Sequence, residues 1–171
     1  MSVITASKSY DDVYRAVALR GDLHLVVLGC DKCAKTSETG GAAQARELRE
    51  RLRGSGLMLR EVPGLVDALE EGLCDPKAVA ERLRPLIGAD RDYQIVVLSC
   101  GAGLKCVRDL LPGVRLTPGL DTLGPGVKGE LACLACGHCE FGDGGCRMLR
   151  VADEQARRLA RGYPGAAQSS R

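Results

Sequence analysis

The sequence of 171 residues has no tryptophan, one phenylalanine and only two histidines. It therefore lacks the aromatic platforms on which nucleic-acid bases stack. Its 24 basic residues nearly balance its 22 acidic residues, so no strong positive field draws it to phosphate. No apolar run approaches the ~20 residues of a membrane span, and the N-terminal stretch lacks the basic and apolar parts of a signal peptide. We expect a cytoplasmic protein with no nucleic-acid partner and no membrane insertion.

Cysteine, in contrast, is abundant, with nine in the chain. In a reducing cytoplasm, clustered thiols bind metal or do redox work more often than they form disulfides. Four of them follow the spacing C-x₂-C-x₂-C-x₆-C in a glycine-rich stretch: Cys133, Cys136, Cys139 and Cys146. This spacing favours an iron–sulfur cluster, and we predict a [4Fe–4S] cluster here, with a zinc site as the alternative. His138 lies inside the loop and could donate a hydrogen bond to a cluster sulfur, or else face solvent.

The chain before this loop alternates apolar runs of strand length with amphipathic segments. Strands are predicted at 23–28, 57–62, 93–98 and 114–117, and helices within 1–22, over 42–53, from Pro76 and from Gly101. This order predicts an α/β fold, with a small parallel sheet that is Rossmann-like or flavodoxin-like. We place the α/β domain at 1–125, with a linker over 118–129. A cysteine-rich, metal-binding appendage follows at 126–171, and a closing helix is predicted at 147–161.

A second group of cysteines is predicted from the topology of that sheet. Cys30 and Cys100 end the first and third predicted strands, and their preceding segments, Val26-Val27-Leu28-Gly29 and Val96-Val97-Leu98-Ser99, closely repeat each other. Cys74 immediately precedes a helix start, and Cys33 is three residues after Cys30. Because parallel strands share one carboxyl edge, these four thiols are predicted to meet there and to ligate another [4Fe–4S] cluster.

Simpler roles remain open for these cysteines. Cys74 and Cys100 could be small buried apolar residues, since free cysteine is often found in cores. Cys30 and Cys33 could form a dithiol redox pair. Cys106, one turn into the helix predicted from Gly101, is interpreted as a packed core thiol, and His24 as a core residue with a satisfied ring.

The order of these motifs resembles a known family. The motifs are Gly29-Cys30-x-x-Cys33, Thr39-Gly40-Gly41, Cys74-Asp75, Ser99-Cys100-Gly101-Ala102-Gly103, Pro118-Gly119-Leu120-Asp121-Thr122 and the Cys133-to-Cys146 loop with Gly144-Gly145-Cys146. Across roughly residues 23–150 the chain is similar to the small iron–sulfur subunit of anaerobic methylenetetrahydrofolate reductases, the methylenetetrahydrofolate reductase C-terminal domain family. The resemblance implies a non-catalytic subunit that carries clusters and exchanges electrons with a flavin-containing catalytic partner.

The sequence therefore favours one function and leaves two alternatives. The first is an iron–sulfur electron-transfer subunit of such an oxidoreductase complex. The second is a zinc-binding structural or interaction subunit of a one-carbon enzyme complex. The third is a dithiol oxidoreductase that uses Cys30 and Cys33. No histidine or carboxylate is placed to act as a general base, so no catalytic residue is predicted.

Overall fold

The computed structural model describes residues 2–19, 24–87, 92–127 and 130–131, and the side chains of 125–131 are not described. Seven strands and six helices occur in these ranges, in the order β1 (Ser2–Ser7), α1 (Tyr10–Ala18), β2 (His24–Cys30), α2 (Cys33–Thr36), α3 (Ala42–Gly54), β3 (Ala68–Leu69), α4 (Pro76–Arg82), α5 (Arg84–Ile87), β4 (Tyr93–Leu98), α6 (Gly101–Leu110), β5 (Arg115–Pro118), β6 (Leu120–Val127) and β7 (Glu130–Leu131).

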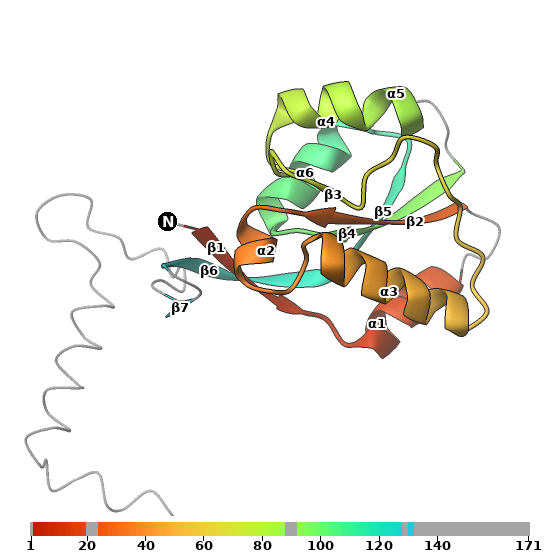
Figure 1. Cartoon of the computed structure of the whole chain (residues 1–171), viewed down its shortest axis with the longest axis horizontal. Helices are drawn as coiled ribbons and strands as arrows, with labels where there is room; N and C mark the ends of the chain where they lie inside the picture. The colour runs from red at the N-terminus through yellow and green to blue at the C-terminus, as the bar shows by residue number, and fades with distance from the viewer. Residues whose placement is uncertain (1, 20–23, 88–91, 128–129, 132–171) are drawn as a thin grey trace, which may run out of the picture.

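The main sheet is parallel and has the strand order β3-β2-β4-β5. This confirms the predicted α/β class and the predicted pairing of the first and third apolar runs. Figure 1 shows α4, α5 and α6 on one face of the sheet and α1 and α3 on the other. Because helices cover both faces, the two central strands have no solvent-facing side: Val27 and Leu28 in β2 and Ile95 to Val97 in β4 are at most 1% exposed.

The helix boundaries follow from local chemistry. Ser9 caps α1 by accepting a hydrogen bond from the Asp12 amide at 3.1 Å. Asp75 caps α4 in the same way, accepting from the amides of Lys77 at 2.9 Å and Ala78 at 3.2 Å. The predicted helix from Pro76 is interrupted after Arg82, shortly before Pro85, whose ring cannot be accommodated inside a regular helix.

Three predicted segments differ from the structure. The helix predicted within 1–22 is confirmed as α1, in which Val13 and Val17 are buried. Residues 2–7, however, form the strand β1. The strand predicted at 57–62 is wrong: it makes one isolated bridge, Leu25 with Leu59, and the sheet's edge strand is β3. The linker predicted over 118–129 contains β6, whose partner β1 lies more than a hundred residues earlier in the chain, so no local pattern could reveal the pairing.

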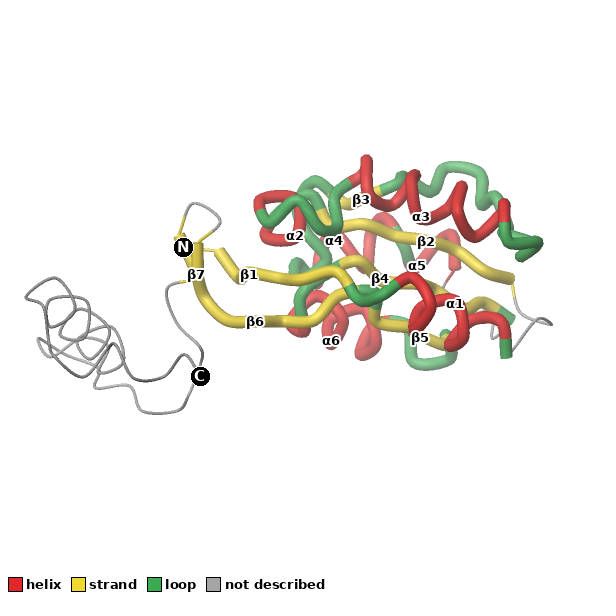
Figure 2. Tube along the Cα trace, turned by 90° about the horizontal axis from the view of Figure 1, so that it is seen from below, coloured by secondary structure: helices red, strands yellow, loops and turns green. Residues whose placement is uncertain are grey.

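Strands β1 and β6 pair antiparallel, and β7 pairs with β6, to form a second, three-stranded sheet. Figure 2 shows β1 and β6 running side by side beyond the α/β body at the end where α2 lies. Thr5 of β1 fixes this ribbon to the loop after α2, because its amide donates to Ser37 Oγ at 3.3 Å and its hydroxyl lies 2.6 Å from Thr39 Oγ1. The domain boundary after residue 125 stays a prediction, and β6 continues through it to Val127.

Candidate metal centre

The carboxyl edge of the parallel sheet contains the point where the strand order reverses. The chain passes from β2 to β3 on one side and then to β4 on the other side of β2. The register pairs Gly29 with Leu98, so Cys30, the last residue of β2, and Cys100, two residues after β4, lie at adjacent strand ends. Both residues are buried, at 3% and 6% exposure. Open α/β sheets bind their ligands in the crevice at this position.

Glycines hold the segment after Cys30 tightly against β2. The Cys30 amide donates to the Gly40 carbonyl at 2.8 Å. A Cβ on Gly29 would lie 2.7 Å from that same carbonyl oxygen, which leaves no room for any side chain. Asp31 closes the loop by accepting a hydrogen bond from the Ala42 amide at the start of α3, at 2.9 Å. The predicted Gly-rich loop is thus a close backbone approach that fixes Cys30 in place.

Cys33 and Cys74 approach the same edge from two different elements. Cys33 is the first residue of the short helix α2 and is half-buried. Cys74 follows β3 in the loop that leads to α4, and it is exposed. The same loop contacts Cys30, because the Leu73 amide donates to Cys30 Sγ at 3.5 Å. The structure therefore carries one thiol on each of four segments around the edge.

Cys100 occupies the N-cap position of α6 but does not use its side chain to cap the helix. The Gly101 amide instead donates to the hydroxyl of Thr122 in β6, at 2.8 Å. An N-cap side chain accepts from the second or third amide of a helix, so Thr122 satisfies an amide that Cys100 could not reach as a cap. This hydrogen bond ties the start of α6 to β6.

The other three thiols all contribute to the pKa of Cys74. Partial burial raises this pKa most, and negative charge on Cys100 and then Cys30 raises it further. A backbone hydrogen bond lowers it, and charge on Cys33 adds a smaller increase. All three of the other predicted ligands thus act on Cys74, as expected for thiols that converge on one site.

The four thiols lie around one edge of the sheet, but they are not arranged as metal ligands. Across the described ranges, no three His, Cys, Asp or Glu residues are arranged closely enough to hold a metal ion. The four thiols fit an iron–sulfur cluster or zinc by donor type and number, because both are bound by four cysteine thiolates.

The proximity of Cys74 and Cys100 predicts a pH effect in the metal-free, reduced protein. Since only thiolates are alkylated, Cys74 should react more slowly at pH about 8.5 than an unperturbed cysteine, and its rate should rise at higher pH than usual. Cys100→Ser removes a charge that raises the Cys74 pKa, so the rate profile should move to lower pH. Peptide mapping of iodoacetamide-treated protein by mass spectrometry measures this for Cys74 alone.

Cys106→Ser is the control for that experiment, because Cys106 is not among the groups that shift the Cys74 pKa. A Cys74 profile that is identical in the parent and in Cys100→Ser would show that the two sulfurs do not share a site. Cys106 itself is half-buried on α6, and burial, followed by the charges of Asp109 and Asp75, raises its pKa. It was predicted to be a packed core thiol, and it does pack against the core from its edge.

Of the remaining predicted residues, His24 lies in the described part of the chain and the C-terminal group does not. His24 is only half-buried, but its ring is satisfied: Nε2 lies 2.8 Å from Arg60 Nη1, and the ring is tilted against Tyr93 at 5.7 Å. The whole C-terminal group lies outside the described residues, as does the predicted helix at 147–161. That group comprises Cys133, Cys136, His138, Cys139 and Cys146, and its ligand roles stay predictions.

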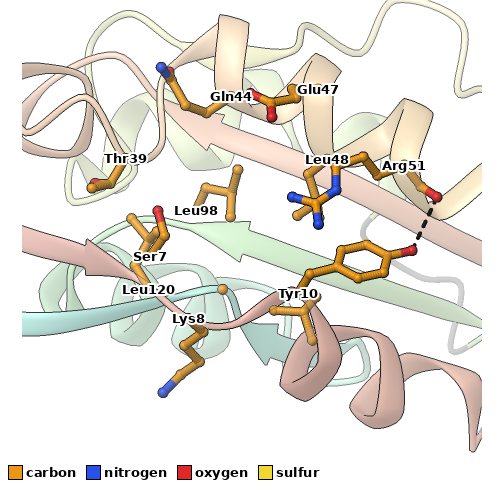
Figure 3. Close-up of a pocket in the computed structure, with 12 residues that line it drawn as sticks. Ser7, Lys8, Tyr10, Thr39, Gln44, Glu47, Leu48, Arg51, Leu98 and Leu120 are labelled. Atoms are coloured by element: carbon orange, nitrogen blue, oxygen red, sulfur yellow. Dashed lines mark hydrogen bonds between the residues drawn. The ribbon is translucent and has the colours of Figure 1, made fainter.

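A small cavity of about 110 Å³ was not predicted from the sequence. It lies between α1, α3 and the start of β6 and contains none of the four cysteines (Figure 3). Arg51 and Tyr10 contact each other at the wall of the cavity. The Arg51 guanidinium lies 4.2 Å from the centre of the Tyr10 ring, and the Tyr10 hydroxyl donates to the Arg51 carbonyl at 3.1 Å. Its lining comes from elements far apart in sequence, so only the fold brings it together.

Comparisons with known proteins add no family assignment, because no family model, curated protein or solved structure matches the chain. The helices in the described part of the chain are all too short or too polar to cross a membrane.

Proposed function

We propose that this protein is an iron–sulfur subunit that exchanges electrons with a flavin-containing partner, as part of an oxidoreductase complex of the methylenetetrahydrofolate reductase type. The observation that carries the proposal is the gathering of Cys30, Cys33, Cys74 and Cys100 at the strand-order reversal of the parallel sheet. Four thiols from four separate segments are more than core packing requires. The Cys133-to-Cys146 motif supplies a second set of four thiols in the same chain.

The four sheet-edge cysteines would have different tasks in such a site. Cys30 and Cys100 are buried, so they would anchor a bound group on the side that excludes water. Cys33 and Cys74 are more exposed and would hold it close to the surface, where a partner can approach. The Leu73 amide already donates to Cys30 Sγ, and hydrogen bonds to ligating sulfurs tune reduction potentials. A [4Fe–4S] cluster bound there would supply one-electron redox chemistry.

The flavin-containing partner is proposed from the family resemblance. A subunit that carries clusters passes single electrons to a partner, and flavins accept and donate single electrons.

Anaerobic purification followed by iron, sulfide and zinc analysis tests the proposal. We expect a brown protein with broad visible absorbance and about eight iron atoms per chain, from two [4Fe–4S] clusters. About four iron atoms would leave a single cluster and overturn one of the two sites. A colourless protein with zinc and no iron would overturn electron transfer in favour of the structural zinc function. Redox activity without any metal, lost in Cys30→Ser, would favour the dithiol function.

A further inference from the structure

We propose that the cavity between α1 and α3 binds a small α-amino acid, with Arg51 holding its carboxylate and Glu47 holding its ammonium group. This inference goes beyond the proposed function and needs no metal at the sheet edge. It assigns a ligand to the cavity drawn in Figure 3, whose described lining includes no cysteine.

The cavity combines an apolar lining with a position at the carboxyl end of the parallel sheet. Leu98 is the last residue of β4, and it lines the cavity together with Val13 and Leu120; all three are at most 5% exposed. Open α/β sheets bind ligands beyond the carboxyl ends of their strands, and ligand sites combine apolar walls with a few polar groups. The volume of about 110 Å³ equals that of roughly four water molecules, which suits a ligand of the size of glycine or alanine.

Arg51 presents a positioned guanidinium to this cavity. It reaches from α3 over the Tyr10 ring, with the guanidinium 4.2 Å from the ring centre, and Figure 3 shows it pointing toward Leu98. Tyr10 is itself held in place, because its hydroxyl donates to the Arg51 carbonyl at 3.1 Å and lies 2.6 Å from Ser55 Oγ. The ring occupies one face of the guanidinium. A carboxylate binds along the N–H edges of a guanidinium, and stacking leaves these edges open.

Glu47 and Arg51 lie one helical turn apart on α3 and both line the cavity, yet they do not pair with each other. The same i, i+4 spacing does give an ion pair in α6, between Lys105 and Asp109. In the described part of the chain, neither Glu47 nor Arg51 forms an ion pair with any other residue. Because Arg51 stacks on Tyr10, one exposed anion and one exposed cation stay available at the same cavity.

An α-amino acid matches this pair of charges. Its carboxylate and its ammonium group are attached to one carbon atom, and side chains at i and i+4 begin only about 5–6 Å apart, so both groups can be bound at once. A simple carboxylate would be attracted by Arg51 and repelled by Glu47, and a simple amine would meet the reverse. The arrangement therefore favours a zwitterion over a ligand of either single charge. Since both side chains are exposed, we expect a dissociation constant on the order of 1 mM.

The test is a titration of the full-length, anaerobically purified, ¹⁵N-labelled protein with glycine, with acetate and with methylamine at constant ionic strength. Amide signals are followed in ¹H–¹⁵N correlation spectra. We expect glycine to shift the signals of α3 and of residues 7–10 in a saturable way. Acetate and methylamine each engage only one of the two charges, so they should bind at least about threefold more weakly.

Two variants separate the two charges. Arg51→Gln should weaken the binding of glycine and of acetate roughly tenfold, because both lose their carboxylate partner. Glu47→Gln should weaken glycine binding about twofold to fivefold, while acetate binding stays the same or becomes tighter because the repelling carboxylate is gone. Glu50→Gln is the matched control, since Glu50 is another exposed carboxylate on α3 but pairs with Arg53 and does not line the cavity. It should leave both affinities unchanged.

Each other outcome would overturn the proposal. If glycine causes no saturable shift up to about 10 mM, tenfold above the expected dissociation constant, the cavity does not bind amino acids. Equal affinities for glycine and acetate, or equal losses in Glu47→Gln and Glu50→Gln, would remove Glu47 from the site and exclude the zwitterion. Circular dichroism and iron content should match the parent in all three variants, so the result stands or falls separately from the proposed function.

Discussion

Gly40→Ala is expected to lower the free energy of unfolding by about 2–3 kcal/mol, because the added methyl group has no space. A Cβ at this position would lie 2.6 Å from the Leu98 carbonyl oxygen, 2.8 Å from Ala34 Cβ and 2.9 Å from Leu120 Cδ1. The closest of these atoms belongs to the backbone of a central strand, which cannot rotate away. Urea unfolding followed by circular dichroism measures the change.

The same substitution should also disturb the candidate site. The Gly40 carbonyl accepts the Cys30 amide, so displacing Gly40 pulls on the strand end that carries the most buried predicted ligand. We expect Gly40→Ala to lose iron together with stability. Gly54→Ala is the matched control, because a Cβ there would meet nothing within 4 Å. Its stability should be unchanged or higher by up to about 1 kcal/mol, since alanine favours helix over glycine. Equal losses in both variants would show that packing around Gly40 is not the cause.

The double variant Cys33→Ala/Cys74→Ala is expected to bind about half the iron of the parent, roughly four atoms instead of eight per chain. Two of the four thiols at the sheet edge are removed, and two cysteines alone do not satisfy a cubane cluster. These two positions are chosen because they are the more exposed members of the set, so the core residues Cys30 and Cys100 stay in place. Anaerobic iron and sulfide analysis gives the stoichiometry.

Cys106→Ala is the control for this double variant, since Cys106 is a half-buried thiol on α6 outside the predicted set. It should keep the parent's iron content. Circular dichroism checks that the double variant retains the α/β fold, as its substitutions lie outside the buried strands. A folded double variant with the full eight atoms would contradict the sheet-edge site and leave its thiols as ordinary cysteines.

The predicted strands differ in how far the sequence could place them. The runs at 23–28 and 93–98 are apolar at nearly every position, and a strand covered by helices on both faces must have that pattern. Their parallel pairing could therefore be predicted, and β2 and β4 confirm it. The run at 57–62 has similar residues but forms only one bridge, at Leu59. Composition alone did not distinguish it from the shorter β3.

The sequence likewise predicts some features of the candidate site and not others. That Cys30 and Cys100 lie at neighbouring strand ends follows from the repeated apolar segments before them. That Cys74 joins them depends on the path of the loop after β3, which the sequence indicates only through the helix cap at Asp75. The hydrogen bond from the Gly101 amide to Thr122 could not be predicted, because Thr122 lies in β6, a segment interpreted as a linker.

The sequence by itself determined the α/β class, the central strands and the positions of four cysteines at or near strand ends. Strands that are buried on both faces have a continuous apolar pattern, and parallel strands end at the same edge of the sheet, so both features can be predicted from the residue order. Only the tertiary structure decided the β1–β6 ribbon and the close approach of Gly40 to Leu98 of β4. Each of these depends on contacts between segments that lie far apart in the chain, and the free energy of such contacts is set by packing and hydrogen bonding that no local pattern encodes.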